Sequence, residues 1–89
     1  MDFQSKQICK MAVSFYGSLH QEIIAVEELS ELIQAISHKR RGREHNIAEE
    51  IADVEIMLEQ LKQINECHSD VEEFKTQKLE RLLKRIEED

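Results

Sequence analysis

The stretch from Ser18 to Arg41 constrains the fold of this chain most strongly. If it forms a helix, its apolar residues cover almost the whole circumference and leave one narrow polar strip. These apolar residues are Ile23, Ile24, Val26, Leu29, Leu32, Ile33, Ala35 and Ile36. Such a helix needs neighbours on more sides than one layer of an 89-residue chain provides. We therefore expect an all-α fold, a four-helix bundle that is completed by oligomerisation.

The rest of the chain is also typical of helices. It contains no proline and two glycines, Gly17 and Gly42, so few turns are forced on the backbone. The spacing of apolar residues predicts helices at about 2–16, 18–41 and 47–64, and a fourth from about 69 to near the carboxyl end. We expect a single helical domain that spans residues 1–89.

Local signals predict where these helices begin and end. Gly42 is expected to end the second helix in a left-handed conformation, after a cationic last turn. Three helix starts are predicted from capping boxes, in which a short polar residue precedes Glu or Gln by three positions. These pairs are Ser18 with Gln21, Asn46 with Glu49, and Ser69 with Glu72.

Two pairs of carboxylates stand three residues apart, Glu28 with Glu31 and Glu50 with Asp53. Residues at this spacing share one face of a helix, so each pair can converge on a single point. Glu28 and Glu31 also lie on the same side of their helix as the apolar Ala35, which predicts that they point inward. Two carboxylates about 4 Å apart repel by roughly 4 kcal/mol at an effective dielectric of 20, and a divalent cation would reverse this repulsion.

Four carboxylates without a histidine form a hard oxygen site, which suits Mg²⁺, with Mn²⁺ as an alternative, better than zinc or copper. Magnesium commonly shares its coordination shell with substrate phosphates. Glu27 lies beside Glu31 on the helical wheel and is a candidate to accept a proton from an attacking water. The candidate catalytic residues are therefore Glu27, Glu28, Glu31, Glu50 and Asp53, of which the last four are the candidate metal ligands.

Cations gather on the apolar side of the fourth helix, where Lys75, Lys78 and Arg81 are candidates to bind phosphate. The alternative for the two lysines is that their stems lie along a core edge while their amines reach water. A second basic stretch, residues 39–43, either compensates the dipole of a helix end or contacts phosphate.

Charge and composition exclude several other classes. A net charge of −7 argues against binding to a nucleic acid polymer, because phosphate backbones require a basic footprint. Two cysteines are too few for a disulfide framework or a zinc site, which fits a reducing cytoplasm. The first residues are polar and no apolar run approaches about 18 residues, so we expect no signal peptide, no membrane association and a cytoplasmic protein. The four histidines share no spacing with the carboxylates, and we assign them no site.

The motifs EELSEL at 27–32 and EEIADV at 49–54 together resemble the EExxE…ExxD signature of the MazG-like, all-α nucleoside triphosphate pyrophosphohydrolases. The 18 residues between Glu31 and Glu50 suit that signature, and YGSLHQ, KRRGR and KTQKLERL resemble family segments too. The resemblance implies a Mg²⁺-dependent hydrolysis of (d)NTP between the α and β phosphates, giving (d)NMP and pyrophosphate.

The same resemblance assigns roles and an assembly. It implies metal ligands at Glu28, Glu31, Glu50 and Asp53, and phosphate contacts at Lys78, Arg81 and Lys75. It also implies a homodimer or homotetramer, with subunit interfaces that help to form the site.

Three alternatives remain open. The same scaffold could act on another nucleotide, such as phosphoribosyl-ATP or an oxidised or methylated nucleotide. The chain could instead be a non-catalytic helical interaction module with its acidic residues in solvent. A di-iron bundle is disfavoured, because such bundles use Glu-x-x-His on two helices and here the last position of each motif is Glu31 or Asp53.

Overall fold

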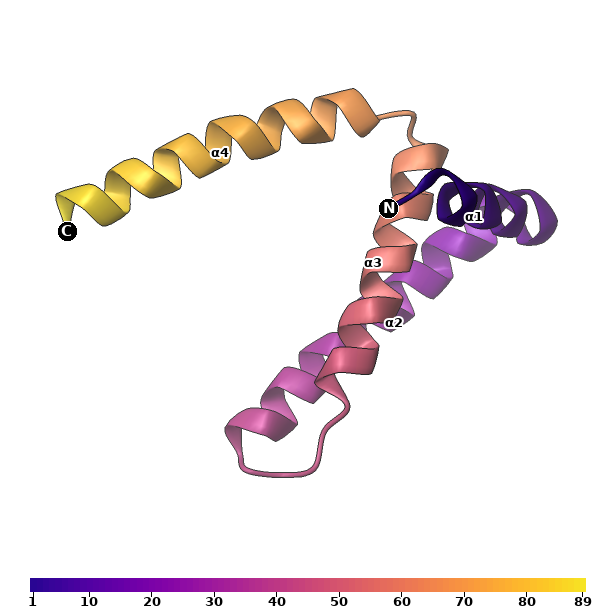
Figure 1. The fold of residues 1–89 in the computed structure, drawn as a ribbon. Helices are drawn as coiled ribbons and strands as arrows, with labels where there is room; N and C mark the ends of the chain where they lie inside the picture. Colours follow the sequence, from indigo (N-terminus) through magenta and orange to yellow (C-terminus); the bar gives the residue numbers. More distant parts are fainter.

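The computed structural model describes all 89 residues as four α-helices without strands (Figure 1). The helices are α1 (Phe3–Tyr16), α2 (Ser18–Arg40), α3 (Ile47–Ile64) and α4 (His68–Glu88). The predicted all-α class is thus confirmed, with helix boundaries within about two residues of those expected. None of the four helices is both long and apolar enough to cross a bilayer.

Both glycines lie where helices are interrupted. Gly17 separates α1 from α2 with a φ of 92°, and Gly42 follows α2 with a φ of 70°. The amide of Gly42 donates to the carbonyl of Lys39 at 3.0 Å, and the amide of Arg43 donates to the carbonyl of His38 at 2.9 Å. This pair of bonds is a Schellman motif, so Gly42 ends α2 as predicted.

The three predicted capping boxes are wrong. The cap of α2 is Gly17, whose carbonyl accepts from the amide of Gln21 at 3.1 Å, so Ser18 is the first residue of the helix and not its cap. The cap of α4 is Cys67, two residues before the predicted Ser69, and its carbonyl accepts from the amide of Val71 at 2.9 Å. Ser69 is therefore helical. Asn46 does occupy the cap of α3, but its side chain makes no capping bond and is held by a carboxylate instead.

Helices α2 and α3 form the main pair, and α1 packs against both of them. Only nine of the 89 residues are buried, and no large side chain is completely enclosed. The buried apolar residues are Cys9, Ala25, Ala35, Val54 and Met57. Much of the apolar surface of α2 remains exposed, including Ile23 at 53% and Ile33 at 67%. A single chain thus covers only part of the helix that was expected to need neighbours on several sides.

Helix α4 packs only against α3, and it extends away from the other three helices (Figure 1). The radius of gyration is 15.8 Å, whereas a compact domain of 89 residues has about 12 Å. The four helices do not close into a bundle within one chain.

Helix α3 ends in a second Schellman motif. The amide of Glu66 donates to the carbonyl of Gln63 at 3.3 Å, and the amide of Cys67 donates to the carbonyl of Lys62 at 3.1 Å. Glu66 occupies the left-handed position of this motif with a φ of 50°, although it is not glycine. The backbone therefore turns sharply before α4 begins.

A buried carboxylate holds the same corner. The carboxylate of Glu59, 4% exposed, lies 2.8 Å from Nε2 of His68 at the start of α4 and accepts from Nε2 of Gln63 at 2.9 Å. Burial alone would raise the pKa of Glu59, but hydrogen bonds from Gln63 and His68 and the charges of His68 and Lys6 outweigh it and lower the pKa. Helix α4 is thus attached to α3 by backbone and side-chain bonds.

Candidate metal centre

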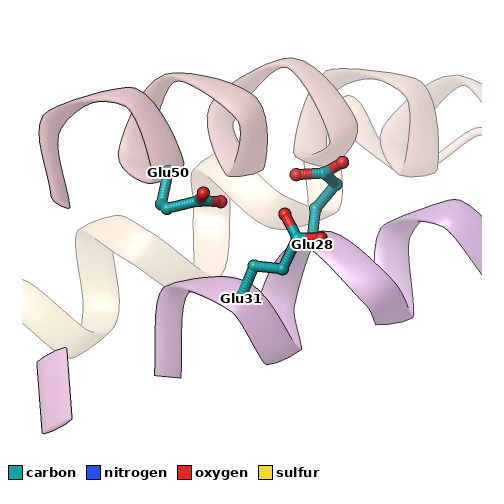
Figure 2. Close-up of side chains that lie close together, drawn as sticks. All are labelled: Glu28, Glu31 and Glu50. Atoms are coloured by element: carbon teal, nitrogen blue, oxygen red, sulfur yellow. The ribbon is translucent and has the colours of Figure 1, made fainter. Parts of the chain in front are cut away.

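Three of the predicted metal ligands meet between α2 and α3. Glu28 and Glu31 of α2 and Glu50 of α3 each offer a carboxylate oxygen, and the three oxygens lie within 4.8 Å of one another. Figure 2 shows the three side chains turned toward one another in the space between the two helices. Glu50 is buried, Glu28 is half-buried and Glu31 is exposed. We call these three residues the carboxylate triad.

The charges of the triad oppose one another. Burial raises the pKa of Glu28, and the carboxylates of Glu31, Asp53 and Glu50 raise it further. The pKa of Glu31 is raised first by the charge of Glu50 and then by partial burial. Burial, which is the larger cause for Glu28, and like charges, which are the larger cause for Glu31, both make the ionised carboxylates less favourable.

Two oxygens of the triad lack a hydrogen-bond partner although they are buried, Oε2 of Glu28 and Oε2 of Glu50. The other oxygen of Glu50 accepts from Nδ2 of Asn46 at 2.8 Å. No lysine or arginine pairs with the triad, since the two ion pairs of the molecule lie elsewhere. A buried acceptor without a partner typically costs about 1–3 kcal/mol, and a cation bound between the two helices would remove this cost. Because all the available ligand atoms are carboxylate oxygens, the site fits a hard divalent cation.

Asp53, the fourth predicted ligand, lies beside the triad rather than within it. It follows Glu50 by three residues on α3, is half-buried, and is close enough to raise the pKa of Glu28. Its oxygens do not belong to the group that meets within 4.8 Å. Glu27 is exposed and makes no hydrogen bond or ion pair through its side chain, so nothing in the single chain aims it at the triad.

The predicted phosphate-binding residues are not brought to the triad within one chain. Lys75, Lys78 and Arg81 lie together along one exposed side of α4, and α4 does not contact α2. Lys75 pairs with Glu72 on its own helix at 3.0 Å. The basic stretch at residues 39–43 is exposed, makes no ion pair and lies at the end of α2.

The structure also reveals polar contacts that the sequence patterns did not indicate. Asn46 orients Glu50, His68 meets Glu59, and Nε2 of Gln21 donates to Oε1 of Gln60 at 2.8 Å between α2 and α3. Asn46 could have been found, because it precedes Glu50 by four residues across the first turn of a helix. The other two pairs join residues nine and 39 positions apart, for which no local pattern exists.

Comparisons of this chain with protein families, with curated proteins and with solved structures find no match. The resemblance to MazG-like enzymes therefore rests on the motifs of the sequence alone.

Proposed function

We propose that this protein is a Mg²⁺-dependent nucleotide pyrophosphohydrolase, which cleaves a (d)NTP between the α and β phosphates to (d)NMP and pyrophosphate. The observation that supports it best is the carboxylate triad, with two buried oxygens that lack any partner. The reaction itself is inferred from the resemblance of EELSEL and EEIADV to the MazG-like signature.

In this proposal Glu28, Glu31 and Glu50 hold the cation, and Asp53 is placed to join them. When bound, Mg²⁺ or Mn²⁺ would neutralise the negative charge of the phosphoryl oxygens and orient the phosphates for in-line attack. Asn46 contributes by fixing the orientation of Glu50 through its 2.8 Å hydrogen bond.

The chain must also accept a proton. Water adds to phosphorus at the cleaved anhydride, the P–O–P bridge breaks with pyrophosphate as the leaving group, and the proton released by water passes to a carboxylate. Glu27 remains the candidate for this role because it adjoins Glu28 and has no other partner.

The proposal includes a homodimer or homotetramer. The chain exposes 7233 Å², whereas a compact monomer of its mass exposes about 5,400 Å². The excess of about 1,800 Å² is larger than the roughly 800 Å² that each partner buries in a standard interface. Association therefore supplies the cover that the exposed faces of α2 and α4 lack.

The test is a panel of nucleotides incubated with the protein and Mg²⁺ or Mn²⁺, with pyrophosphate and monophosphate measured together. The panel includes the standard (d)NTPs, oxidised and methylated nucleotides, and phosphoribosyl-ATP. We expect at least one to release pyrophosphate, with activity lost on chelation. If none yields a monophosphate, the catalytic proposal is wrong.

A non-catalytic interaction module is the second candidate, and the large exposed apolar surface favours it. In that case the carboxylates would have no cation, and Mg²⁺ would leave the melting temperature of the protein unchanged. A rise in melting temperature with Mg²⁺ that disappears in Glu28→Gln and Asp53→Asn would exclude this candidate.

A further inference from the structure

We propose that Lys39 and Arg43, at the end of the α2–α3 pair, bind the β and γ phosphates of the nucleotide and hold the pyrophosphate leaving group. The inference rests on the proposed function and assigns the basic stretch at residues 39–43 to the same site as the carboxylate triad. These cations belong to the chain that supplies the triad, so no second copy is required for this contact.

The charge of the site requires cations beyond the bound metal. The triad contributes up to three negative charges, and a triphosphate adds more. A divalent cation offsets only part of this charge. Lysine and arginine side chains that hold the distal phosphates stabilise the charge that develops on the leaving group during phosphoryl transfer.

Lysine and arginine are almost absent from the α2–α3 pair. Neither occurs at residues 18–38 or 47–61. At the far end of α3, Lys62 is 12 residues beyond Glu50 and so about 18 Å further along the helix. The basic stretch lies at the opposite end, in the last turn of α2 and the loop that leads to α3 (Figure 1). Along these two helices it therefore supplies the cations nearest to the triad.

Lys39 lies on the face of α2 that carries the triad. On the helical wheel it is about 50° from the midpoint of Glu28 and Glu31, whereas Arg40 is about 150° from that midpoint. Lys39 is eight residues beyond Glu31, or about 12 Å along the helix. The buried Ala35 lies between them on the same face. Lys39 is thus on the triad side of α2, and Arg40 is on the opposite side.

Arg43 lies in the loop that returns the chain to the triad. Its amide donates to the carbonyl of His38 at 2.9 Å and closes the turn that ends α2. Only four residues separate Arg43 from the start of α3 at Ile47, which is at most about 14 Å of extended chain. Asn46, at the end of this loop, already donates to Glu50. The loop therefore leads directly from Arg43 to the triad.

The basic stretch has no anionic partner within the chain. All its lysine and arginine side chains are exposed, and none forms an ion pair. The alternative role is compensation of the dipole at the end of α2. That role does not distinguish one face of the helix from the other, so Lys39 and Arg40 would contribute alike. A comparison of the two faces therefore decides between the roles.

Binding of inorganic pyrophosphate in the presence of Mg²⁺, measured by isothermal titration calorimetry, tests the inference without catalysis. Lys39→Gln with Arg43→Gln should raise the dissociation constant by about 10-fold or more, because charge-assisted hydrogen bonds are lost. The matched control is Arg40→Gln with Arg41→Gln, which removes two cations from the same stretch at positions more than about 100° from the triad. At 0.15 M salt the control should change the constant much less, since general attraction is screened beyond about 8 Å.

Equal weakening by the two pairs of substitutions would overturn the inference, as would unchanged binding in Lys39→Gln, Arg43→Gln. A parent protein that does not bind pyrophosphate would overturn it too. The exchange of Lys39→Arg with Arg43→Lys keeps both charges and should recover most of the affinity. If this variant binds as weakly as Lys39→Gln, Arg43→Gln, the assigned phosphate contacts are wrong.

Kinetics separate this inference from the proposed function. If a nucleoside triphosphate is hydrolysed and Lys39→Gln, Arg43→Gln shows the parental KM and kcat, the inference fails while the proposed function stands. If no nucleotide is hydrolysed but pyrophosphate binding depends on Lys39 and Arg43, the proposed function fails and the pyrophosphate site stands.

Discussion

Replacing Glu50 by glutamine should raise the free energy of unfolding in the absence of Mg²⁺. The same substitution should remove most of the stabilisation that Mg²⁺ gives the parent protein. Glu50 is the buried member of the triad, and one of its oxygens has no partner. Glutamine keeps the oxygen that accepts from Asn46 and removes the negative charge next to Glu28. Its amide group can also donate to the neighbouring carboxylates.

The size of the effect follows from the geometry. The carboxylate oxygens of Glu28 and Glu50 lie no more than 4.8 Å apart, and two charges separated by that distance repel by about 3.5 kcal/mol at an effective dielectric of 20, and by about 1 kcal/mol in water. We therefore expect Glu50→Gln to raise the free energy of unfolding by about 1–3 kcal/mol in EDTA, with a gain of about 4–8 °C in melting temperature per kcal/mol. The parent should gain about 2.7 kcal/mol at a Mg²⁺ concentration 100 times its dissociation constant, and the variant should gain little.

Thermal unfolding at one fixed protein concentration, in EDTA and over a Mg²⁺ series, measures both effects. Glu49→Gln is the matched control, because it makes the same chemical change at an exposed neighbour outside the triad. It should not stabilise the protein in EDTA, and it should respond to Mg²⁺ like the parent. The reasoning is refuted if Glu50→Gln destabilises the protein in EDTA or retains the full response to Mg²⁺.

Three further predictions concern the fold. Because the pKa of Glu59 is lowered in the folded protein, this residue contributes to stability above its ordinary pKa of 4.5. The contribution is lost as the pH falls through the lower pKa of the folded state. Urea midpoints should therefore decline more steeply below about pH 4.5 in the parent than in Glu59→Gln. Gly42→Ala should destabilise the protein by about 1 kcal/mol in urea denaturation, because φ is 70° there although an added Cβ meets nothing within 4 Å; an unchanged midpoint would contradict this. Glu66→Gly should instead stabilise the protein by up to about 1 kcal/mol, because glycine adopts the left-handed backbone conformation of this position without strain. The substitution also removes a negative charge from the carboxyl end of α3. A lower urea midpoint would show that the turn is not strained.

Features that depend on nearby residues could be predicted from the sequence. The helical period located all four helices, and Gly42 marked the end of α2 because few other residues accept its left-handed conformation. The meeting of Glu28, Glu31 and Glu50 follows from two i, i+3 pairs on packed helices. The helix starts were less accurate, because Gly17 and Cys67 supply backbone carbonyls that begin α2 and α4 without side-chain caps.

Features that join distant residues could not be predicted. An amphipathic pattern showed which side of α4 is apolar and cationic, but it does not identify the element that covers this side. The direction of α4 depends on Glu59, which meets His68 across the corner, and on a left-handed residue that is not glycine. The histidines were assigned no site, yet His68 holds this corner.

The most direct test of the proposed function is to identify the products formed from the best nucleotide of the panel by phosphorus NMR, for the parent and for Glu50→Gln in the presence of Mg²⁺. We predict that the parent forms monophosphate and pyrophosphate in equal amounts, and that Glu50→Gln forms neither. Formation of a nucleoside diphosphate with inorganic phosphate, or equal rates for the two proteins, would contradict hydrolysis between the α and β phosphates at this carboxylate triad.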